Sequence, residues 1–366
     1  SKSAAAQDPT SYVDATIGDA DTFDPALPYD TSSGEILQNV YETLVFYDGA
    51  ATDKFVPQLA ESYSVSDDGK VWTFQIRQGV KFHEGGDLTP SDVAYSFQRG
   101  LLQGGYSSPQ WLLAEPFLGV GMDDITMLVD EGASADDREA LAANDPATLV
   151  KACETVKAAI VADDAAGTVT MTLAQPWGPF LPTIANGWGS IMDMQWVQAN
   201  GGWDGSCDTW QNFYGMVSAD DPFSAIANGT GAFKLDHWTP GEEIVLTKFD
   251  GYWGEAAKLD RVTFKIIPEF GTRFAMLQAG DADSIDVSVE NRPQVDPFVG
   301  VMRVYDPATN AYGDEVAVCK YDSNQLGQAA FTACGAGETG LNQPLRLYIG
   351  RPGLQQDVIL FNFLIE

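Results

Sequence analysis

Hydrophobic and polar residues alternate in two short runs in the second half of the chain, 232–238 and 243–249. Strict alternation is typical of a strand with one buried face. The residues between the runs include Thr239-Pro240-Gly241, which is a tight-turn sequence. We therefore predict that the two runs form a β-hairpin.

The segment that follows the hairpin changes its hydrophobic period twice. Residues 261–267 again alternate and predict a strand, whereas residues of about 271–279 carry apolar side chains at helical spacing. That helix is expected to end at Gly280, because glycine readily adopts the positive φ of a helix C-terminus. Residues 284–289 read as a further strand. Strand, helix and strand at this length predict a crossover unit in a mixed sheet.

The first fifty residues predict one strand and one helix. Residues 12–17 alternate weakly and indicate a first strand. Residues 33–47 predict a helix, because their apolar side chains recur on one helical face. The members of that face are Ile36, Leu37, Val40, Tyr41, Leu44 and Val45.

Local turn and capping sequences place the elements that come next. Asp68-Gly69 favours a hairpin turn, and in residues 71–76 the large side chains Trp72, Phe74 and Ile76 would share one face. Thr89-Pro90 is typical of a helix start, with threonine as N-cap and proline at the first helical position. Three more elements are expected: a short helix from Asp145-Pro146, and strands over 156–161 and 168–173.

Length and charge limit the classes of protein to consider. The chain has 366 residues, of which 45% are hydrophobic, enough for two or three domains. No apolar run approaches about 18 residues, so no membrane span is expected. The net charge of −32 argues against nucleic-acid binding, because phosphates would be repelled. The charge fits an adaptation for solubility or high salt, or attraction of a cationic ligand.

The N-terminal residues and the cysteines indicate in which cellular compartment the protein works. The N-terminal SKSAAAQDPTS lacks the basic and apolar pattern of a signal peptide, so we expect any such segment to have been removed or left out of this sequence. Cys319 and Cys334 lie in a loop-like stretch, where a local disulfide fits an exported protein. Cys153 and Cys207 could form a second bridge. Sequence alone does not fix the connectivity.

Catalytic and metal-binding motifs are missing from the sequence. It has two histidines, His83 and His237, which we interpret as structural or surface residues. It contains no nucleophile elbow, phosphate-binding loop or HExxH motif. The cluster of Asp19, Asp21 and Asp24 lacks the glycine and glutamate of an EF-hand loop, so turn formation explains it better than calcium. We therefore expect no enzyme, no metal site and no cofactor.

Several sequence blocks resemble the family 5 extracellular solute-binding proteins, the peptide- and nickel-binding receptors of ABC importers. One is the ordered series GTGAFKL, DGYWG, LDRVTFKIIP and LQAGDADSIDV within 228–287. The most specific is LAESYSVSDDGKVWTFQIRQGVKFHEGGDLTPSDVAYSFQR, which spans residues 59–99. The opening block IGDADTFDP is similar to the family's strand and Leu-Asp-Pro loop, with Phe23 in place of the usual leucine.

The resemblance implies a fold: α/β, with the two lobes of a type II periplasmic-binding-protein-like architecture. Lobe I is expected at 11–48 and 176–285, with a β-rich subdomain inserted at 49–175. Lobe II would begin at 286 and be incomplete, because the family continues beyond the apolar run at the end of this chain. We therefore expect the sequence to lack the C-terminal part of a longer protein. Two strands, 345–349 and 357–363, are expected in the last part.

The resemblance also places a ligand site. In peptide-binding members, the loop after the Leu-Asp-Pro element and the segment after the YSF.R helix contribute to the cleft. A third candidate lies in the segment from Trp177 to Trp210, which holds five tryptophans. The candidate ligand-binding residues are Tyr29, Asp30, Thr31, Gln110, Trp111 and Trp188.

The function implied is reversible capture of a di- or oligopeptide by hinge closure, at the periplasmic or extracellular face of the cytoplasmic membrane. The receptor would deliver its ligand to the permease subunits of an ABC importer, and we expect a monomer. Two alternatives stay open. The tryptophans could stack on the sugar faces of an oligosaccharide, or the chain could be an extracellular polymer hydrolase, although no motif selects a catalytic pair.

Overall fold

The computed structural model describes residues 8–49, 51, 53–105, 108–119, 121, 123–130, 137–325 and 327–349. The chain forms two compact units. Unit 1 comprises Ser1–Phe46 and Pro57–Asp286, and unit 2 comprises Tyr47–Val56 and Val287–Glu366. The expected strand at 357–363 lies outside the described residues.

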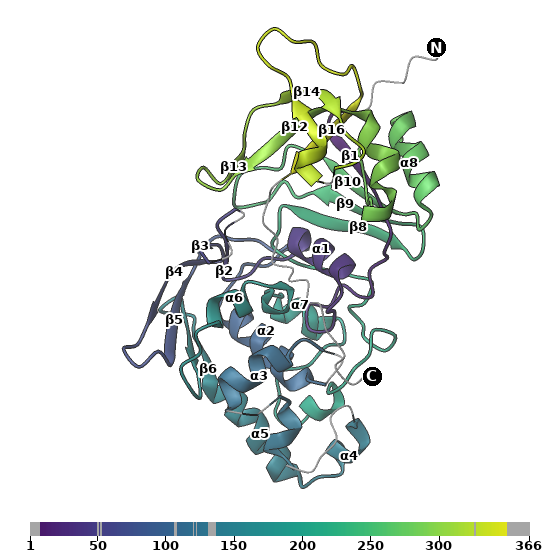
Figure 1. Cartoon of the computed structure of the whole chain (residues 1–366). Helices are drawn as coiled ribbons and strands as arrows, with labels where there is room; N and C mark the ends of the chain where they lie inside the picture. The colour runs from purple at the N-terminus through teal and green to yellow at the C-terminus, as the bar shows by residue number, and fades with distance from the viewer. Residues whose placement is uncertain are drawn as a thin grey trace, which may run out of the picture. The chain divides into compact units, whose positions relative to one another are not determined.

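A mixed five-stranded sheet organises one part of unit 1, in the order β11-β1-β10-β9-β8 (Figure 1). Strand β1 pairs in parallel with β10 and β11, whereas β10, β9 and β8 are antiparallel neighbours. The predicted hairpin and crossover unit are both confirmed. The strands are β1 (Ser11–Thr16), β8 (Phe233–Thr239), β9 (Glu243–Lys248), β10 (Arg261–Ile266) and β11 (Ser284–Ile285).

The crossover helix α8 (Phe270–Ala279) has the caps that its sequence indicates. The Glu269 carboxylate accepts hydrogen bonds from two amides of the first turn, and Gly280 ends the helix at φ 81°. The side chain of Arg273 then fixes the helix to the sheet edge, because its guanidinium donates to the carbonyl oxygens of Ile267, Pro268 and Asp286.

A second sheet in unit 1 is fully antiparallel, in the order β4-β5-β7-β6. Helices α2 and α5 pack on one side of it (Figure 1). Phe74 and Ile76 are fully buried, as the alternation predicted. Helix α2 begins with Thr89 as its N-cap, as expected, and Thr89 and Asp92 form a capping box in which they satisfy each other's backbone amides. The elements are β4 (Ala60–Val65), β5 (Val71–Ile76), β6 (Ile160–Asp163), β7 (Thr168–Thr172), α2 (Pro90–Gln103) and α5 (Pro146–Ala159).

The structure corrects three predicted element boundaries. Helix α1 spans Thr31–Val40 only, and the chain then runs extended into β2 (Val45–Tyr47) instead of staying helical to residue 47. Helix α5 extends to Ala159, so the strand predicted at 156–161 is wrong in its first four residues. The strand predicted at 284–289 ends at Ile285. The apolar residues predicted for the α1 face are nevertheless all buried. Hydrophobicity therefore identified the core but not the end of the helix.

Contacts with residues distant in sequence end helix α1. The amide of Gly231 donates to the carbonyl of Val40 at 2.9 Å. The carboxylate of Glu42 then accepts hydrogen bonds from Thr230 Oγ1, Tyr252 OH and Trp253 Nε1 at 2.8–2.9 Å. Burial raises the pKa of Glu42, and these neutral donors offset part of that effect. The extended chain after Val40 brings this carboxylate to its partners.

We expect Gly229→Ala to destabilise unit 1 by about 2 kcal/mol, because a Cβ there would overlap the carbonyl oxygen of Val40. Chemical denaturation monitored by circular dichroism would measure the loss. Gly34→Ala within α1 is the matched control, since a Cβ there meets no atom within 4 Å. The control should gain roughly 0.5–1 kcal/mol from helix propensity. Equal effects of the two substitutions would contradict the proposed packing.

Of the remaining helices and turns of unit 1, α3, α7, η2 and η3 contact α2. Trp203 and Trp210 are buried among them, and their indole N–H groups donate to the carbonyls of Ser206 and Leu149. A disulfide joins Cys153 of α5 to Cys207. The helices are α3 (Trp111–Leu118), α4 (Arg138–Ala142), α6 (Phe180–Ile184) and α7 (Met194–Ala199), with 3₁₀ turns η1 (Ile125–Leu128), η2 (Gly187–Gly189) and η3 (Trp210–Asn212).

Unit 2 is built on a β-sheet of order β13-β12-β14-β15, with β16 parallel to β12. Its buried cluster consists of Val299, Met302, Val318, Ala330 and Phe331. A disulfide joins Cys319 to Cys334. The elements are β3 (Phe55–Pro57), which pairs with β2, and β12 (Val299–Asp306), β13 (Ala311–Tyr312), β14 (Val316–Tyr321), β15 (Phe331–Ala333), β16 (Leu345–Ile349), α9 (Arg292–Val295), η4 (Val289–Asn291), η5 (Asp296–Phe298) and η6 (Gly327–Ala330).

Among the described residues, none of the helices combines the length and the apolar character needed to cross a membrane.

Candidate ligand-binding site

The loop that carries the first candidate residues is anchored by a buried ion pair. Arg99 of α2 holds the carboxylate of Asp24 through both terminal nitrogens, with Nη1 to Oδ1 at 2.8 Å. Burial alone would raise the pKa of Asp24, but the charge and hydrogen bonds of Arg99 hold it below its usual range. Asp24 also accepts from the amide of Ala26. The start of the loop is therefore fixed to α2 by charge-assisted hydrogen bonds.

A second buried carboxyl group faces the same guanidinium. Asp221 Oδ1 lies 4.0 Å from Arg99 Nη2, and the carboxyl group of Asp221 shares a hydrogen bond with that of Asp24. Burial and the neighbouring charge of Asp24 raise the pKa of Asp221 to about 8. Asp221 is therefore neutral near pH 7, and the cluster holds one anion and one cation.

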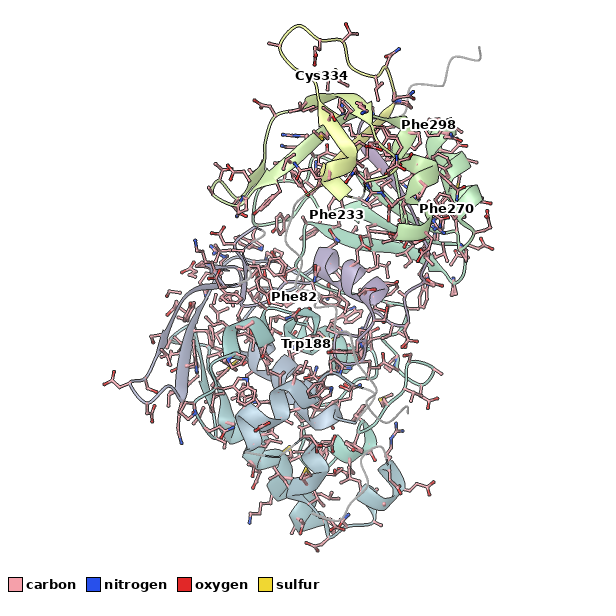
Figure 2. All side chains as sticks on the ribbon, viewed as in Figure 1. Phe82, Trp188, Phe233, Phe270, Phe298 and Cys334 are labelled. Carbon is pink, nitrogen blue, oxygen red and sulfur yellow. A yellow bond between two sulfur atoms is a disulfide. The ribbon has the colours of Figure 1, made fainter. Side chains whose placement is uncertain are left out.

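Two aromatic candidates meet beyond this anchor. The rings of Tyr29 and Trp188 stack with their centroids 5.9 Å apart, and Tyr29 is 65% exposed. Trp188 (Figure 2) belongs to η2. Its indole Nε1 is buried without a hydrogen-bond partner among the described residues. The pair therefore presents an exposed phenol ring beside a partly covered indole.

Gln110 lies behind this aromatic pair. Its side chain is almost completely buried, and its Nε2 is 3.5 Å from the carbonyl oxygen of Trp188. Gly100 of α2 leaves the space that the amide fills, since a Cβ there would overlap it. Ser108 Oγ donates to the carbonyl of Ala26 and accepts from the amide of Gln110. These bonds link the segment after α2 to the loop before Tyr29.

The other three candidates contribute differently. Asp30 is the N-cap of α1, and its Oδ1 accepts from the amide of Ser33 at 2.7 Å. Thr31 is the exposed first residue of that helix. Trp111 begins α3 and is 42% exposed. The structure thus brings Tyr29, Gln110 and Trp188 together, whereas Asp30 has a structural role.

The chemistry available here is that of a binding surface. Flat aromatic faces bury apolar or planar groups, and fixed polar atoms orient them. A cavity of about 10 Å³ beside Gly187, next to Glu42 and Gln58, has room for about one water molecule. That cavity is therefore too small for a solute, and the exposed aromatic surface of this region is the Tyr29–Trp188 pair.

Residues considered for catalysis or metal binding have structural partners instead. The ring of His83 contacts the carbonyl oxygen of Gly231 at 2.9 Å, and burial lowers the pKa of His83 to about 4. His237 lies between the carboxylates of Asp236 and Glu243, whose hydrogen bonds raise its pKa. Asp19 accepts from the indole of Trp238 and the amide of Gly241.

Sequence reasoning missed the group formed by Asp24, Arg99 and Asp221. Arg99 stands in a motif that the resemblance used, but no partner for it was identified from the sequence. Seventy-five residues separate Arg99 from Asp24. A buried arginine on the apolar face of an amphipathic helix requires a carboxylate, and this was the one available signal.

The fold and this binding surface define a class of protein. The family model of bacterial extracellular solute-binding proteins, family 5 (middle) matches residues 54–313. The chain belongs to this family, whose members are binding proteins and not enzymes. The fold is the mixed α/β fold of periplasmic binding proteins, as the resemblance implied.

Particular relatives are similar at low identity. The dipeptide-binding protein of Escherichia coli K12 is 28% identical over 278 residues, which cover 72% of this chain and 42% of the relative. Heme-binding protein A of Haemophilus influenzae is 29% identical over 272 residues, covering 72% and 41%. The chain therefore spans about two fifths of the length of these relatives.

Solved structures show the same partial coverage. The periplasmic binding protein DppA of Helicobacter pylori, in complex with the peptide STSA, superposes with a TM-score of 0.55 at 25% identity. The match covers 80% of this chain and 49% of DppA. The binding protein AgaA of A. tumefacien R10, in complex with agropinic acid, gives a TM-score of 0.54 at 25% identity and covers 81% and 48%.

Proposed function

We propose that this chain is part of an extracytoplasmic receptor that captures a di- or oligopeptide and delivers it to an ABC importer. Membership of the solute-binding family carries the proposal, and similarity to a dipeptide-binding protein and to a peptide-bound DppA supports the choice of ligand. The two lobes expected from the sequence would close on the ligand, because contacts with the ligand favour the closed state.

Within unit 1, the proposed ligand contacts are the exposed faces of Tyr29 and Trp188, with Trp111 beside Gln110. An apolar or aromatic peptide side chain would stack on the Tyr29 ring, and the buried Gln110 would hold the backbone of Trp188 in place. No catalytic role follows, and the protein would release its ligand chemically unchanged.

We expect Tyr29→Ala and Trp188→Ala each to weaken peptide binding about tenfold or more, because each removes one half of a stacked aromatic surface worth ~1 kcal/mol beyond its area. Isothermal titration calorimetry of di- to pentapeptides on the full-length protein would measure the change. Tyr63→Ala is the matched control. Tyr63 is also an exposed tyrosine, and its ring lies 5.9 Å from the indole of Trp72.

Three outcomes would count against the proposal. Unchanged peptide affinity in both site variants would remove Tyr29 and Trp188 from the site. Stabilisation by oligosaccharides but not peptides in a thermal-shift panel would favour the sugar alternative. Conversion of any ligand to a product during the titration would reject the receptor class and favour the hydrolase.

A further inference from the structure

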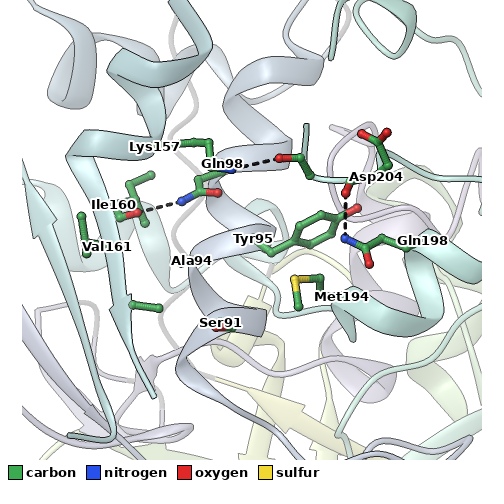
Figure 3. Close-up of a pocket in the computed structure, with 12 residues that line it drawn as sticks. Ser91, Ala94, Tyr95, Gln98, Lys157, Ile160, Val161, Met194, Gln198 and Asp204 are labelled. Carbon is green, nitrogen blue, oxygen red and sulfur yellow. Dashed lines mark hydrogen bonds between the residues drawn. The ribbon is translucent and has the colours of Figure 1, made fainter. Parts of the chain in front are cut away.

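A cavity of about 390 Å³ opens in unit 1 among α2, β6, α7 and the loop after α7 (Figure 3). None of the residues of the candidate ligand-binding site lines it. Its inner wall is buried and consists largely of Ala94, Tyr95 and Ile160. Its rim carries Lys157 of α5 and Asp204 of the loop, and both residues are exposed. The cavity thus combines an apolar base with two opposite charges.

The cavity wall also holds a side-chain amide. Gln98 is only 9% exposed, and its Nε2 donates to the carbonyl of Ile160 at 2.8 Å (Figure 3). Gln98 lines the cavity, and its amide also carries the acceptor Oε1. The cavity therefore offers an acceptor suited to a ligand N–H group.

The two rim charges are separate and available. Lys157 Nζ donates to the carbonyl of Gly205 at 2.9 Å, which leaves two of its three N–H groups free for a ligand. Hydrogen bonds from the Thr209 hydroxyl and the Ser206 amide hold the pKa of Asp204 below its usual range. Within the described chain, Lys157 and Asp204 do not form an ion pair with each other. A ligand carrying both charges could contact both residues.

Covalent and hydrogen bonds build this rim before any ligand arrives. The disulfide from Cys153 fixes Cys207, two residues after Gly205, to the helix turn that precedes Lys157. Gln198 Nε2 donates to the carbonyl of Asp204 at 3.1 Å. A preformed site loses little conformational entropy on binding, which favours even small ligands.

We propose that this cavity is a second ligand site of the protein and that it binds a free α-amino acid. The ligand carboxylate would pair with Lys157. The ligand ammonium would donate to Asp204 and to Gln98 Oε1. An apolar side chain would lie against Tyr95 and Met194. This site is independent of the peptide site proposed above.

Charge and size select this class of ligand. A polyanion such as a nucleotide would meet a single lysine on a chain of net charge −32. A simple organic cation would be opposed by Lys157. A zwitterion satisfies both rim charges at once, and a cavity of about 390 Å³ has room for an amino acid.

Ligand-observed NMR with glycine, leucine, glutamate and lysine, each added alone to the full-length protein, tests the proposal. At least one amino acid should bind saturably with a Kd of about 1 mM or tighter. Lys157→Met and Asp204→Asn should each weaken binding at least tenfold. The matched controls Lys151→Met on the same helix and Asp208→Asn on the same loop should leave the Kd unchanged.

N-acetyl-leucine amide, which lacks both charges, should not bind at the same concentrations. Binding of this analogue with the affinity of leucine would overturn the zwitterion assignment. Failure of all four amino acids to saturate at 20 mM would overturn the site, as would equal affinity in the Lys157 variant. Loss of amino-acid binding in Trp188→Ala would place the ligand in the proposed peptide site instead.

Discussion

Arg99→Met should destabilise unit 1 by about 3–5 kcal/mol, a large part of the stability of an ordinary domain. The substitution removes the only cation beside Asp24 within the described cluster, and that carboxylate is fully buried. The loop to Tyr29 would lose its anchor on α2 at the same time. Urea denaturation followed by tryptophan fluorescence would report the change in unfolding free energy.

Two further variants isolate the electrostatic part of this effect. Lys81→Met breaks the exposed pair with Asp87 and should cost less than about 1 kcal/mol. The double variant Arg99→Met with Asp24→Asn removes both buried charges and should be more stable than Arg99→Met alone. A double variant as unstable as the single one would show that packing of the arginine, and not its charge, stabilises this region.

Stability should fall as pH rises from about 4 to about 8, and Asp221→Asn should reduce that dependence. Burial and the neighbouring Asp24 raise the folded-state pKa of Asp221 to about 8, above the ordinary carboxyl value. Over this window the folded state keeps a proton that the unfolded state has released. The unfolding free energy therefore decreases by about 1.4 kcal/mol per pH unit for this group. Thermal unfolding at intervals of one pH unit would measure the slope.

The variant has to be compared with the parent, because a chain with 52 acidic residues also repels itself more strongly as pH rises. Asparagine has the size of a neutral carboxyl group. The variant therefore keeps the pH dependence of stability that comes from the rest of the chain and loses only the contribution of Asp221. Asp220→Asn, on the exposed neighbour, is the control and should follow the parent. Parallel slopes for all three proteins would mean that Asp221 is ionised in the folded state.

Most of the local structure could be predicted from the sequence because short-range rules decide it. The hairpin around Pro240, the N-cap at Thr89 and the C-terminal glycine of α8 each depend on residues within one turn. The length of α1 could not be predicted in this way. Its end depends on Glu42, whose partners Tyr252 and Trp253 follow about 210 residues later.

In the candidate site, too, some features could be predicted from the sequence and others depend on the tertiary fold. The resemblance selected the segments that hold Tyr29, Gln110 and Trp188, and the structure brings these three residues together. The capping role of Asp30 was not predicted, because the helix was expected to begin at residue 33 and Asp30 was assigned to the ligand. The amino-acid cavity could not be predicted, since Gln98, Lys157 and Asp204 come from three separate segments that only the tertiary fold assembles.

The two disulfides have a consequence for how the protein matures. Cys153 pairs with Cys207, and Cys319 pairs with Cys334, so each cysteine joins its nearest cysteine along the chain. Four cysteines allow three connectivities. The observed connectivity forms if each cysteine is oxidised together with the next cysteine that emerges during synthesis. We expect oxidative refolding to reach the native pairing without a disulfide isomerase, and peptide mapping of the early oxidised species would show these two bridges first.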